Sequence, residues 1–376
     1  MQLLHLQLFY HKYRKKSRAW IKGKALNLFL TKSSLNFIIY MYNIYENHEW
    51  KNQERISPMT AYETYRTIRK NMEQTIAGKG DVIDLSIIAL FCGGHILIED
   101  VPGTGKTMLA RSLAASIDGE YKRIQFTPDL LPSDVTGINY FNMKESEFRF
   151  MRGPVFTNIL LADEINRATP KTQAGLLECM EEHTATVDGK TYPLADPFMV
   201  IATQNPLESM GTYPLPEAQL DRFLIKTAVG YPDFKSAVEI LRRFGESRGV
   251  KSASPVVTRA DVTDAIMETA KVYCHEDLME YIVRIIEMTR SMPGVVLGAS
   301  PRAALSLLMV AKGFAVISGR NYVLPDDVKS AAIPVLNHRL ILTSSEMLKK
   351  NSAERIICEV LSKTPVPTET VFDGRA

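Results

Sequence analysis

Cysteine is scarce in this chain of 376 residues, and the four cysteines are far apart. No two of them stand in a CxxC spacing, and none has a histidine at the spacing of metal ligands. This pattern argues against a metal site and is typical of reduced thiols in a cytoplasm. We therefore expect a cytoplasmic protein whose cysteines are mostly small core residues. The four are Cys92, Cys179, Cys274 and Cys358.

Long apolar runs are also lacking. The most apolar stretch near the start, LNLFLTKSSLNFIIYMY at residues 26–42, contains Lys32 and two serines, so it is short and polar for a membrane span. No uninterrupted apolar core precedes a small-residue cleavage site, which argues against a secretory signal. We therefore expect no membrane span.

Neither sign of charge dominates the chain, whose formal net charge is +3. Residues 1–57 hold ten Lys and Arg against three Glu, whereas the rest of the chain holds 35 basic and 39 acidic residues. The basic segment at 11–24 has two interpretations: an arm that touches membrane or nucleic acid, or upstream frame ahead of a true start at Met41 or Met59. We favour the second, because organised sequence begins only near Met59.

Short apolar runs alternate with helical patterns in the first half of the chain, which predicts an α/β fold with a doubly wound parallel sheet. The predicted strands are residues 95–99, 121–126, 158–164, 198–205 and 223–229. Helices are expected at 60–77 and 81–92. Residues 138–153 and 184–194 alternate around turn residues and read as inserted hairpins, the second turning at Asp188-Gly189.

Only helical patterns follow from residue 231 to about residue 345. The expected organisation is therefore an N-terminal extension at 1–57, an α/β nucleotide-binding domain at 58–230, a small all-helical domain at 231–345, and a C-terminal helix and tail at 346–376.

The stretch LIEDVPGTGKTMLA, residues 97–110, departs at one position from the phosphate-binding pattern G-x-x-x-x-G-K-[ST]. Asp100 stands where the first glycine is expected. The stretch still follows a predicted strand and opens a predicted helix, so its backbone N–H groups can wrap a phosphate, Lys106 can reach the β and γ oxygens, and Thr107 can ligate Mg²⁺. The predicted ATP-binding residues are Pro102, Gly103, Thr104, Gly105, Lys106, Thr107 and Met108.

The Asp100 carboxylate would repel phosphates if it faced them. Aspartate also enters unusual φ/ψ regions more readily than most residues. We therefore expect this carboxylate to point away from the nucleotide and to bond loop backbone N–H groups or a nearby cation.

Three further positions carry candidate chemistry. The run ILLADE ends in Asp163, placed to hold Mg²⁺, and Glu164, placed to activate water, although such acids can also be merely solvated. Asn205 ends FMVIATQN and either caps a turn or orients the attacking water. Arg222, in LPEAQLDRF, is either a surface ion pair or an arginine finger acting across a subunit boundary.

In this order the motifs resemble the AAA+ ATPases, and more narrowly the MoxR family. The residues that carry the resemblance, which runs from about Met59 to the end of the chain, are EDVPGTGKT, LLADEINRATPKTQAGLLECMEE, ATQNP, PEAQLDRF and GASPRA. The resemblance implies a P-loop core followed by a helical lid. It assigns Lys106 and Thr107 to Walker A, Asp163 and Glu164 to Walker B, Asn205 to sensor 1, Arg222 to the finger, and Arg302 to sensor 2. Arg167 would face the neighbouring subunit.

The same resemblance implies ATP hydrolysis with Mg²⁺ in a homo-oligomeric ring, expected to be a hexamer. The ring would remodel or mature client proteins, with its two hairpins on the ring's face or pore, and would work with a von Willebrand factor A-domain protein. One alternative is a nucleic-acid motor. On the first hairpin, however, Lys144, Arg149 and Arg152 are accompanied by Glu145 and Glu147, which gives no convincing basic track. Two others are a magnesium-chelatase-like subunit and a nucleotide switch without useful turnover.

Overall fold

The computed structural model describes residues 59–206, 211–246 and 253–367. These residues form two compact units: one holds the described residues up to 271 together with 316–319, and the other holds 272–315 and residues from 320 onward. The division therefore falls after residue 271, not after residue 230. The reason is that α11 (Arg259–Lys271) packs against α4 (Ala61–Thr75) and α5 (Gly80–Phe91) of the first unit. The predicted extension at 1–57 lies outside the described residues.

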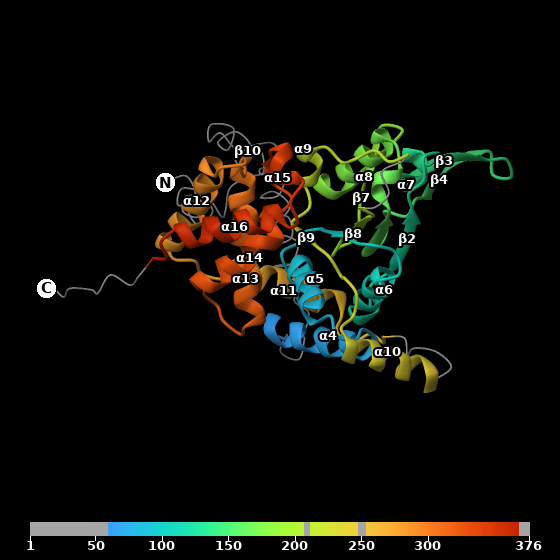
Figure 1. Ribbon diagram of the computed structural model, residues 1–376. Coiled ribbons are helices and arrows are strands. Elements are labelled where there is room, and N and C mark those ends of the chain that lie inside the picture. Colours follow the sequence, from blue (N-terminus) through green and yellow to red (C-terminus); the bar gives the residue numbers. More distant parts are fainter. Residues whose placement is uncertain (1–58, 207–210, 247–252, 368–376) are drawn as a thin grey trace, which may run out of the picture. The chain divides into compact units, whose positions relative to one another are not determined.

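The five predicted strands form one parallel sheet, which confirms the α/β prediction (Figure 1). The strand order is β2-β5-β8-β1-β9, so β1 lies between two strands that come much later in the chain. All carboxyl ends therefore meet at one edge of the sheet. The strands are β1 (Ile96–Glu99), β2 (Tyr121–Gln125), β5 (Ile159–Asp163), β8 (Met199–Gln204) and β9 (Ile225–Thr227).

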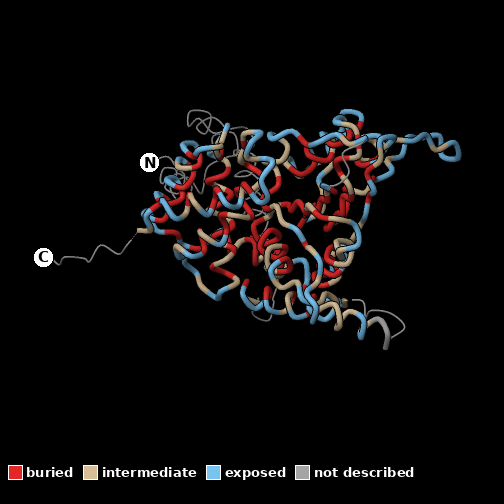
Figure 2. Tube along the Cα trace, viewed as in Figure 1, coloured by how far each residue is buried: buried red, intermediate tan, exposed pale blue. Residues whose placement is uncertain are grey.

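Both faces of this sheet are buried (Figure 2). On one face, strand residues such as Leu160 and Val200 form a core cluster with Leu176 and Leu177 of α8 (Pro170–Glu182). Their sequence neighbours, such as Leu161, point to the other face and have no exposed surface either. On that side α6 (Lys106–Ser116) contacts β2 and β5 and packs against α4. The near-continuous apolar strands are explained by this double covering.

The two predicted hairpins are also confirmed. The first pairs β3 (Gly137–Asn142) with β4 (Glu147–Arg152) and projects away from the rest of its unit (Figure 1). The second pairs β6 (Thr184–Val187) with β7 (Lys190–Pro193). At its turn Asp188 and Gly189 have φ values of 48° and 76°, the left-handed pair that a two-residue hairpin turn requires.

A buried histidine fixes the beginning of β1. His95 accepts a hydrogen bond at Nδ1 from the backbone N–H of Val200 (3.0 Å), so its other ring nitrogen, Nε2, carries the proton and donates it to the carbonyl oxygen of Met180 (3.1 Å). Burial lowers the pKa of His95 to about 4. Nearby, burial and the neighbouring His95 lower the pKa of His183 to about 3. His95 is therefore a neutral link between β1, β8 and α8.

The second unit is mostly helical, as expected, but one detail of the prediction is wrong. Residues Val295–Leu297 (β10) and Ile341–Leu342 (β11) pair as a short antiparallel ribbon. Strands of three and two residues are too short to show an alternating pattern. The helices of this unit are α12 (Glu276–Ser291), α13 (Pro301–Ile317), α14 (Pro325–Leu336), α15 (Ser344–Met347) and α16 (Ser352–Lys363).

In the part of the chain that the structure describes, no helix combines the length and the hydropathy that crossing a membrane requires. Of the cysteines, Cys92, Cys179 and Cys274 are buried, as expected for core residues, whereas Cys358 is exposed.

Candidate functional site

The loop between β1 and α6 has the geometry of a phosphate cradle. Gly103 and Gly105 have φ values of 83° and 98°, a region that residues with a Cβ rarely adopt, and nothing lies within 4 Å of where a Cβ would be at either position. Gly105 is the N-cap of α6, and no side chain caps the helix. The first N–H groups of α6 therefore remain available to an anion, which the helix dipole also favours.

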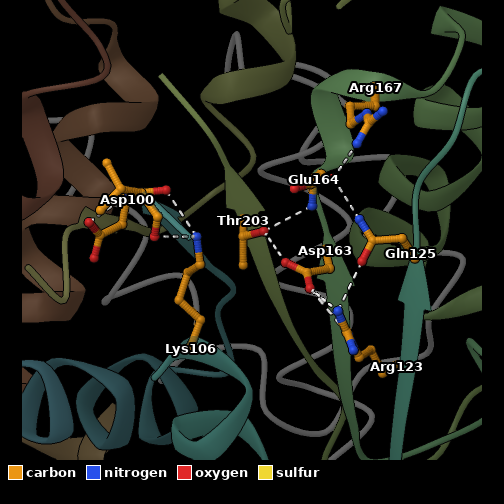
Figure 3. Close-up of polar contacts among 9 residues, drawn as sticks. Asp100, Lys106, Arg123, Gln125, Asp163, Glu164, Arg167 and Thr203 are labelled. Atoms are coloured by element: carbon orange, nitrogen blue, oxygen red, sulfur yellow. Dashed lines mark hydrogen bonds and ion pairs between the residues drawn. The ribbon is translucent and has the colours of Figure 1, made fainter. Parts of the chain in front are cut away.

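The side chain of Lys106 reaches back to Asp100, at the beginning of this loop (Figure 3). Its Nζ donates to the carbonyl oxygens of Asp100 (2.9 Å) and Val101 (3.2 Å). Among the residues that the structure describes, this ammonium group is therefore held by backbone carbonyls alone. Such neutral partners leave the charge of Lys106 available to a phosphate.

Asp100 is buried, and its carboxylate bonds two backbone N–H groups, one of them in the loop as expected from the sequence. Oδ1 accepts from Val101 (2.8 Å) and Oδ2 accepts from Gly230 (2.7 Å). The backbone N–H of Asp100 donates to Gln204 at the end of β8 (3.0 Å). The bond to Val101 matches the prediction for the loop. The bond to Gly230 was missed, because that residue lies 130 positions away and is brought close only by the pairing of β1 with β9.

Asp163 ends β5 between two neighbours that the sequence analysis missed. Thr203 on β8 donates its hydroxyl to Oδ1 (2.6 Å), while Arg123 on β2 donates to Oδ2 from its terminal nitrogen (2.6 Å) and from Nε (3.2 Å). β2 and β8 flank β5 in the sheet, so the register of three parallel strands brings these groups together. Both oxygens of the carboxylate are therefore fixed in direction (Figure 3).

Glu164, the next residue, has a left-handed backbone with φ 55° and ψ 50°. For a non-glycine residue this backbone conformation costs about 1 kcal/mol or more, so contacts with neighbouring residues must stabilise it. Its backbone N–H donates to the Thr203 hydroxyl (2.9 Å). Its Oε2 accepts from Gln125 Nε2 (2.7 Å) and from a terminal nitrogen of Arg167 (3.0 Å).

Gln125 and Arg123, both on β2, form one polar chain with the two acids (Figure 3). Arg123 donates to Gln125 Oε1 (2.9 Å), and because a guanidinium only donates, the oxygen of this amide must face Arg123. Its nitrogen then faces Glu164. β2 therefore positions both Asp163 and Glu164, although the pattern of residues 121–126 indicated no functional role for this strand.

The remaining predicted residues occupy different places. Asn205 follows β8 at the same edge of the sheet and is buried. Arg222 follows α9 (Glu217–Leu220) and forms an ion pair with Glu181 at the end of α8 (3.0 Å). Arg302 stands at the beginning of α13, in the other compact unit. The structure thus brings Lys106, Asp163 and Glu164 to one edge of the sheet, while the roles of the other three stay predictions.

Comparisons with known proteins agree with this geometry. Residues 95–225 match the ATPase family associated with various cellular activities (AAA), and residues 287–360 match the AAA lid domain. The chain is 48% identical over 300 residues to the uncharacterized protein YeaC of Bacillus subtilis, covering 80% of this chain and 94% of that protein.

Two further relatives are similar over comparable lengths. Chaperone MoxR1 of Mycobacterium tuberculosis is 39% identical over 305 residues, covering 79% of this chain and 80% of that protein. The crystal structure of a candidate ATPase from Cytophaga hutchinsonii is 40% identical, superposes with a TM-score of 0.77, and covers 82% of this chain and 96% of its own. The chain therefore belongs to the MoxR family of AAA+ ATPases.

Proposed function

We propose that this protein binds ATP with Mg²⁺ and hydrolyses it, and that a ring of its subunits uses this reaction to remodel or mature partner protein complexes. One observation carries the proposal. The phosphate cradle after β1 and the two acids that end β5 lie at the same edge of one parallel sheet, where side chains of β2 and β8 hold the acids in direction. Fixed oxygen ligands and a fixed base beside a phosphate cradle are the parts that phosphoryl transfer to water needs.

Thr107 and Asp163 are the residues that would hold Mg²⁺, because hydroxyl and carboxylate oxygens are ligands that this ion prefers. When bound, the ion supplies positive charge that neutralises the phosphates. The surroundings of Asp163 fit a bound Mg²⁺. Thr203 already orients one oxygen of this carboxylate, and Arg123 supplies a positive charge at the other. We expect Arg123 to loosen its hold when that charge is supplied from elsewhere.

Hydrolysis proceeds by attack of water on the γ-phosphorus. A bond forms between the water oxygen and phosphorus, the bond to the bridging oxygen of ADP breaks, and the water proton passes to Glu164. Asn205 orients the water. Lys106 and Arg302 of the same subunit neutralise the charge that develops on the phosphate oxygens.

Arg222 acts on the ATP of the neighbouring subunit in this proposal. Support comes from the family resemblance and from its half-buried position next to α9, where Glu181 anchors it. A finger supplied in trans contributes on the order of 10³–10⁵ in rate, so isolated subunits should hydrolyse ATP slowly and the ring, expected to be a hexamer, should be the active form.

The β3–β4 hairpin is the proposed contact with client proteins. Much of this hairpin is exposed (Figure 2). Six of its exposed residues are large and apolar, which is unusual for a surface that contacts only water. They are Ile138, Tyr140, Phe141, Met143, Phe148 and Met151. Of the three basic residues on this hairpin, Arg149 is ion-paired with Glu145 and Glu147, which does not favour a basic track for nucleic acid.

The chaperone reading is supported by the name of the relative MoxR1. The further proposals, a von Willebrand factor A-domain partner and a cytoplasmic location, come from the family resemblance and from the spacing of the cysteines.

A trap variant tests the function. Glu164→Gln should keep ATP and the ring but should not complete hydrolysis, so clients should remain bound to it. Pull-down with this variant should capture the same proteins repeatedly when ATP is present and lose them when Lys106→Ala is added to remove ATP binding. Equal capture with and without ATP would contradict the proposed remodelling activity.

A further inference from the structure

A buried amide on α8 joins two chain segments that the proposed function uses separately. Gln173 has no exposed surface, and its Nε2 donates towards three backbone carbonyl oxygens. Two belong to the turn directly after Glu164, at Ile165 (3.1 Å) and Ala168 (3.1 Å). The third belongs to Tyr213 (2.9 Å), in the segment that leads to Arg222.

The direction of this amide is determined by its partners. Three carbonyl oxygens can accept hydrogen bonds only from the nitrogen of the side chain, so the amide cannot be reversed. Within the described residues its oxygen, Oε1, is buried without a donor. An unsatisfied buried acceptor is unfavourable, and an apolar side chain of similar volume would avoid it. Gln173 is thus explained by the three carbonyls and not by general packing.

The same two segments have further contacts on either side of Gln173. The turn after Glu164 accepts a backbone hydrogen bond at Asn166 from the N–H of Tyr213 (2.6 Å). Nine residues later, Arg222 is ion-paired with Glu181, which lies at the other end of α8 (3.0 Å). α8 therefore holds the segment from Tyr213 to Arg222 at both ends. Its Gln173 also holds the turn that follows the catalytic glutamate, Glu164.

We propose that Gln173 is a positioning residue that couples the two halves of the catalytic machinery in one subunit: the Glu164 turn, which serves the subunit's own ATP, and the Arg222 segment, which serves the neighbour's. This inference rests on the proposed function and deepens it by naming how one site is regulated by the next. A change at Glu164 shifts its turn, Gln173 passes the shift to the Tyr213 segment, and Arg222 moves in the neighbouring site.

Mixed rings separate these two roles. A Glu164→Gln subunit cannot hydrolyse its own ATP but still offers its Arg222, whereas an Arg222→Ala subunit keeps its own Glu164 but offers no finger. Each should be inactive alone. A mixture should regain phosphate release, because Arg222→Ala subunits then receive a finger from Glu164→Gln neighbours.

The decisive variant is Gln173→Met, placed only in the Glu164→Gln subunit. Methionine keeps the length of the side chain but cannot donate, and this subunit no longer contributes hydrolysis of its own. We expect the restored phosphate release to fall about tenfold, because small displacements of a catalytic group have effects of this size or larger. The ATP concentration at half-maximal rate should stay within about twofold, since the hydrolysing site itself is unchanged.

Thr172→Val is the matched control. Thr172 is adjacent on α8 and equally buried, and its hydroxyl donates to the carbonyl oxygen of Leu130, which belongs to neither the Glu164 turn nor the Tyr213 segment. In the same subunit it should leave the restored rate unchanged. Native mass spectrometry should show that both double variants enter mixed rings. Circular dichroism should show that both unfold at the same temperature as the Glu164→Gln subunit.

The outcomes are distinct. Unchanged restored activity with Gln173→Met, or an equal loss with Thr172→Val, would overturn the coupling. If the parent mixture without either change regains no activity, Arg222 does not act in trans, and its proposed role in the neighbouring site falls together with this inference. Should Gln173→Met fail to fold, Glu181→Gln in the same subunit tests the other end of α8: a severalfold loss supports the coupling and no loss refutes it.

Discussion

The carboxylate of Asp100 accepts a hydrogen bond from the backbone N–H of Gly230, with 2.7 Å between nitrogen and oxygen. The acid that replaces a glycine in the phosphate-binding pattern therefore connects the beginning of the loop to the chain that leaves β9. Its other oxygen bonds Val101 within the loop itself. The residue that looks like a defect in the motif is thus a structural part of it.

Replacing Asp100 should affect stability more than nucleotide binding. Asp100→Gly should lower the free energy of unfolding by about 2 kcal/mol, since a hydrogen bond to a charged group contributes about 1.5–3 kcal/mol. Its ATP affinity, measured by titration calorimetry, should stay within a few fold. Asp100→Asn keeps one acceptor oxygen, so its free energy of unfolding should lie between those of Asp100→Gly and the unmodified protein. A large gain in affinity for Asp100→Gly would mean that the acid faces the nucleotide.

Gln125 should hold the catalytic glutamate in the direction that the reaction needs. Its Nε2 donates to Glu164 Oε2 and so fixes the direction of this carboxylate. Gln125→Leu should therefore lower basal ATP hydrolysis by a few fold, measured as phosphate release at saturating ATP. Gln74→Leu, at an exposed position on α4, is the control. An unchanged or higher rate with Gln125→Leu would contradict this orienting role.

The sequence predicted those parts of the fold and site that depend on local patterns. Strands, hairpins and the Asp188-Gly189 turn follow from neighbouring residues, as do the cradle and the acids that end β5. The contacts of Arg123, Gln125 and Thr203 could not be predicted, because they depend on β2, β5 and β8 lying side by side.

Gln173 was missed for a related reason. A glutamine in a helical pattern is ordinarily a solvated residue, and only the fold shows that its partners are carbonyls 5, 8 and 40 positions away.

Acid should destabilise the protein through His95. Below its ordinary pKa of 6.5 the unfolded chain binds a proton, which the folded protein accepts only near pH 4, so folded stability is complete above 6.5 and is lost as the pH falls towards 4. Between pH 7 and pH 5 this histidine alone should lower the free energy of unfolding by about 2 kcal/mol, and His183 should add to the effect.

Urea unfolding at a series of pH values measures this effect. His95→Asn should be less stable at pH 7 but should show a shallower dependence on pH than the unmodified protein. His275→Asn, the same change at an exposed histidine, is the control. An identical slope for His95→Asn and the unmodified protein would contradict the assignment.

The exposed aromatic residues of the first hairpin should matter for clients and not for folding. Phe148 is 74% exposed and makes an edge contact with Phe141. Phe148→Ser in the Glu164→Gln trap should reduce the amount of captured client severalfold without changing thermal unfolding. Phe234→Ser is the matched control, since Phe234 on α10 (Phe234–Glu246) is 83% exposed. Equal capture by both variants would exclude the hairpin as the client contact.

The most direct test of the central claim compares phosphate release with ATP binding in Glu164→Gln and in Glu178→Gln. The second makes the same change at an exposed glutamate of α8. If Glu164 is the base, Glu164→Gln should reduce phosphate release by about 10²-fold or more while ATP affinity changes only a few fold, and Glu178→Gln should match the unmodified protein. Equally slow phosphate release by the unmodified protein and by Glu164→Gln, with ATP bound to both, would contradict the account and indicate a nucleotide switch without turnover.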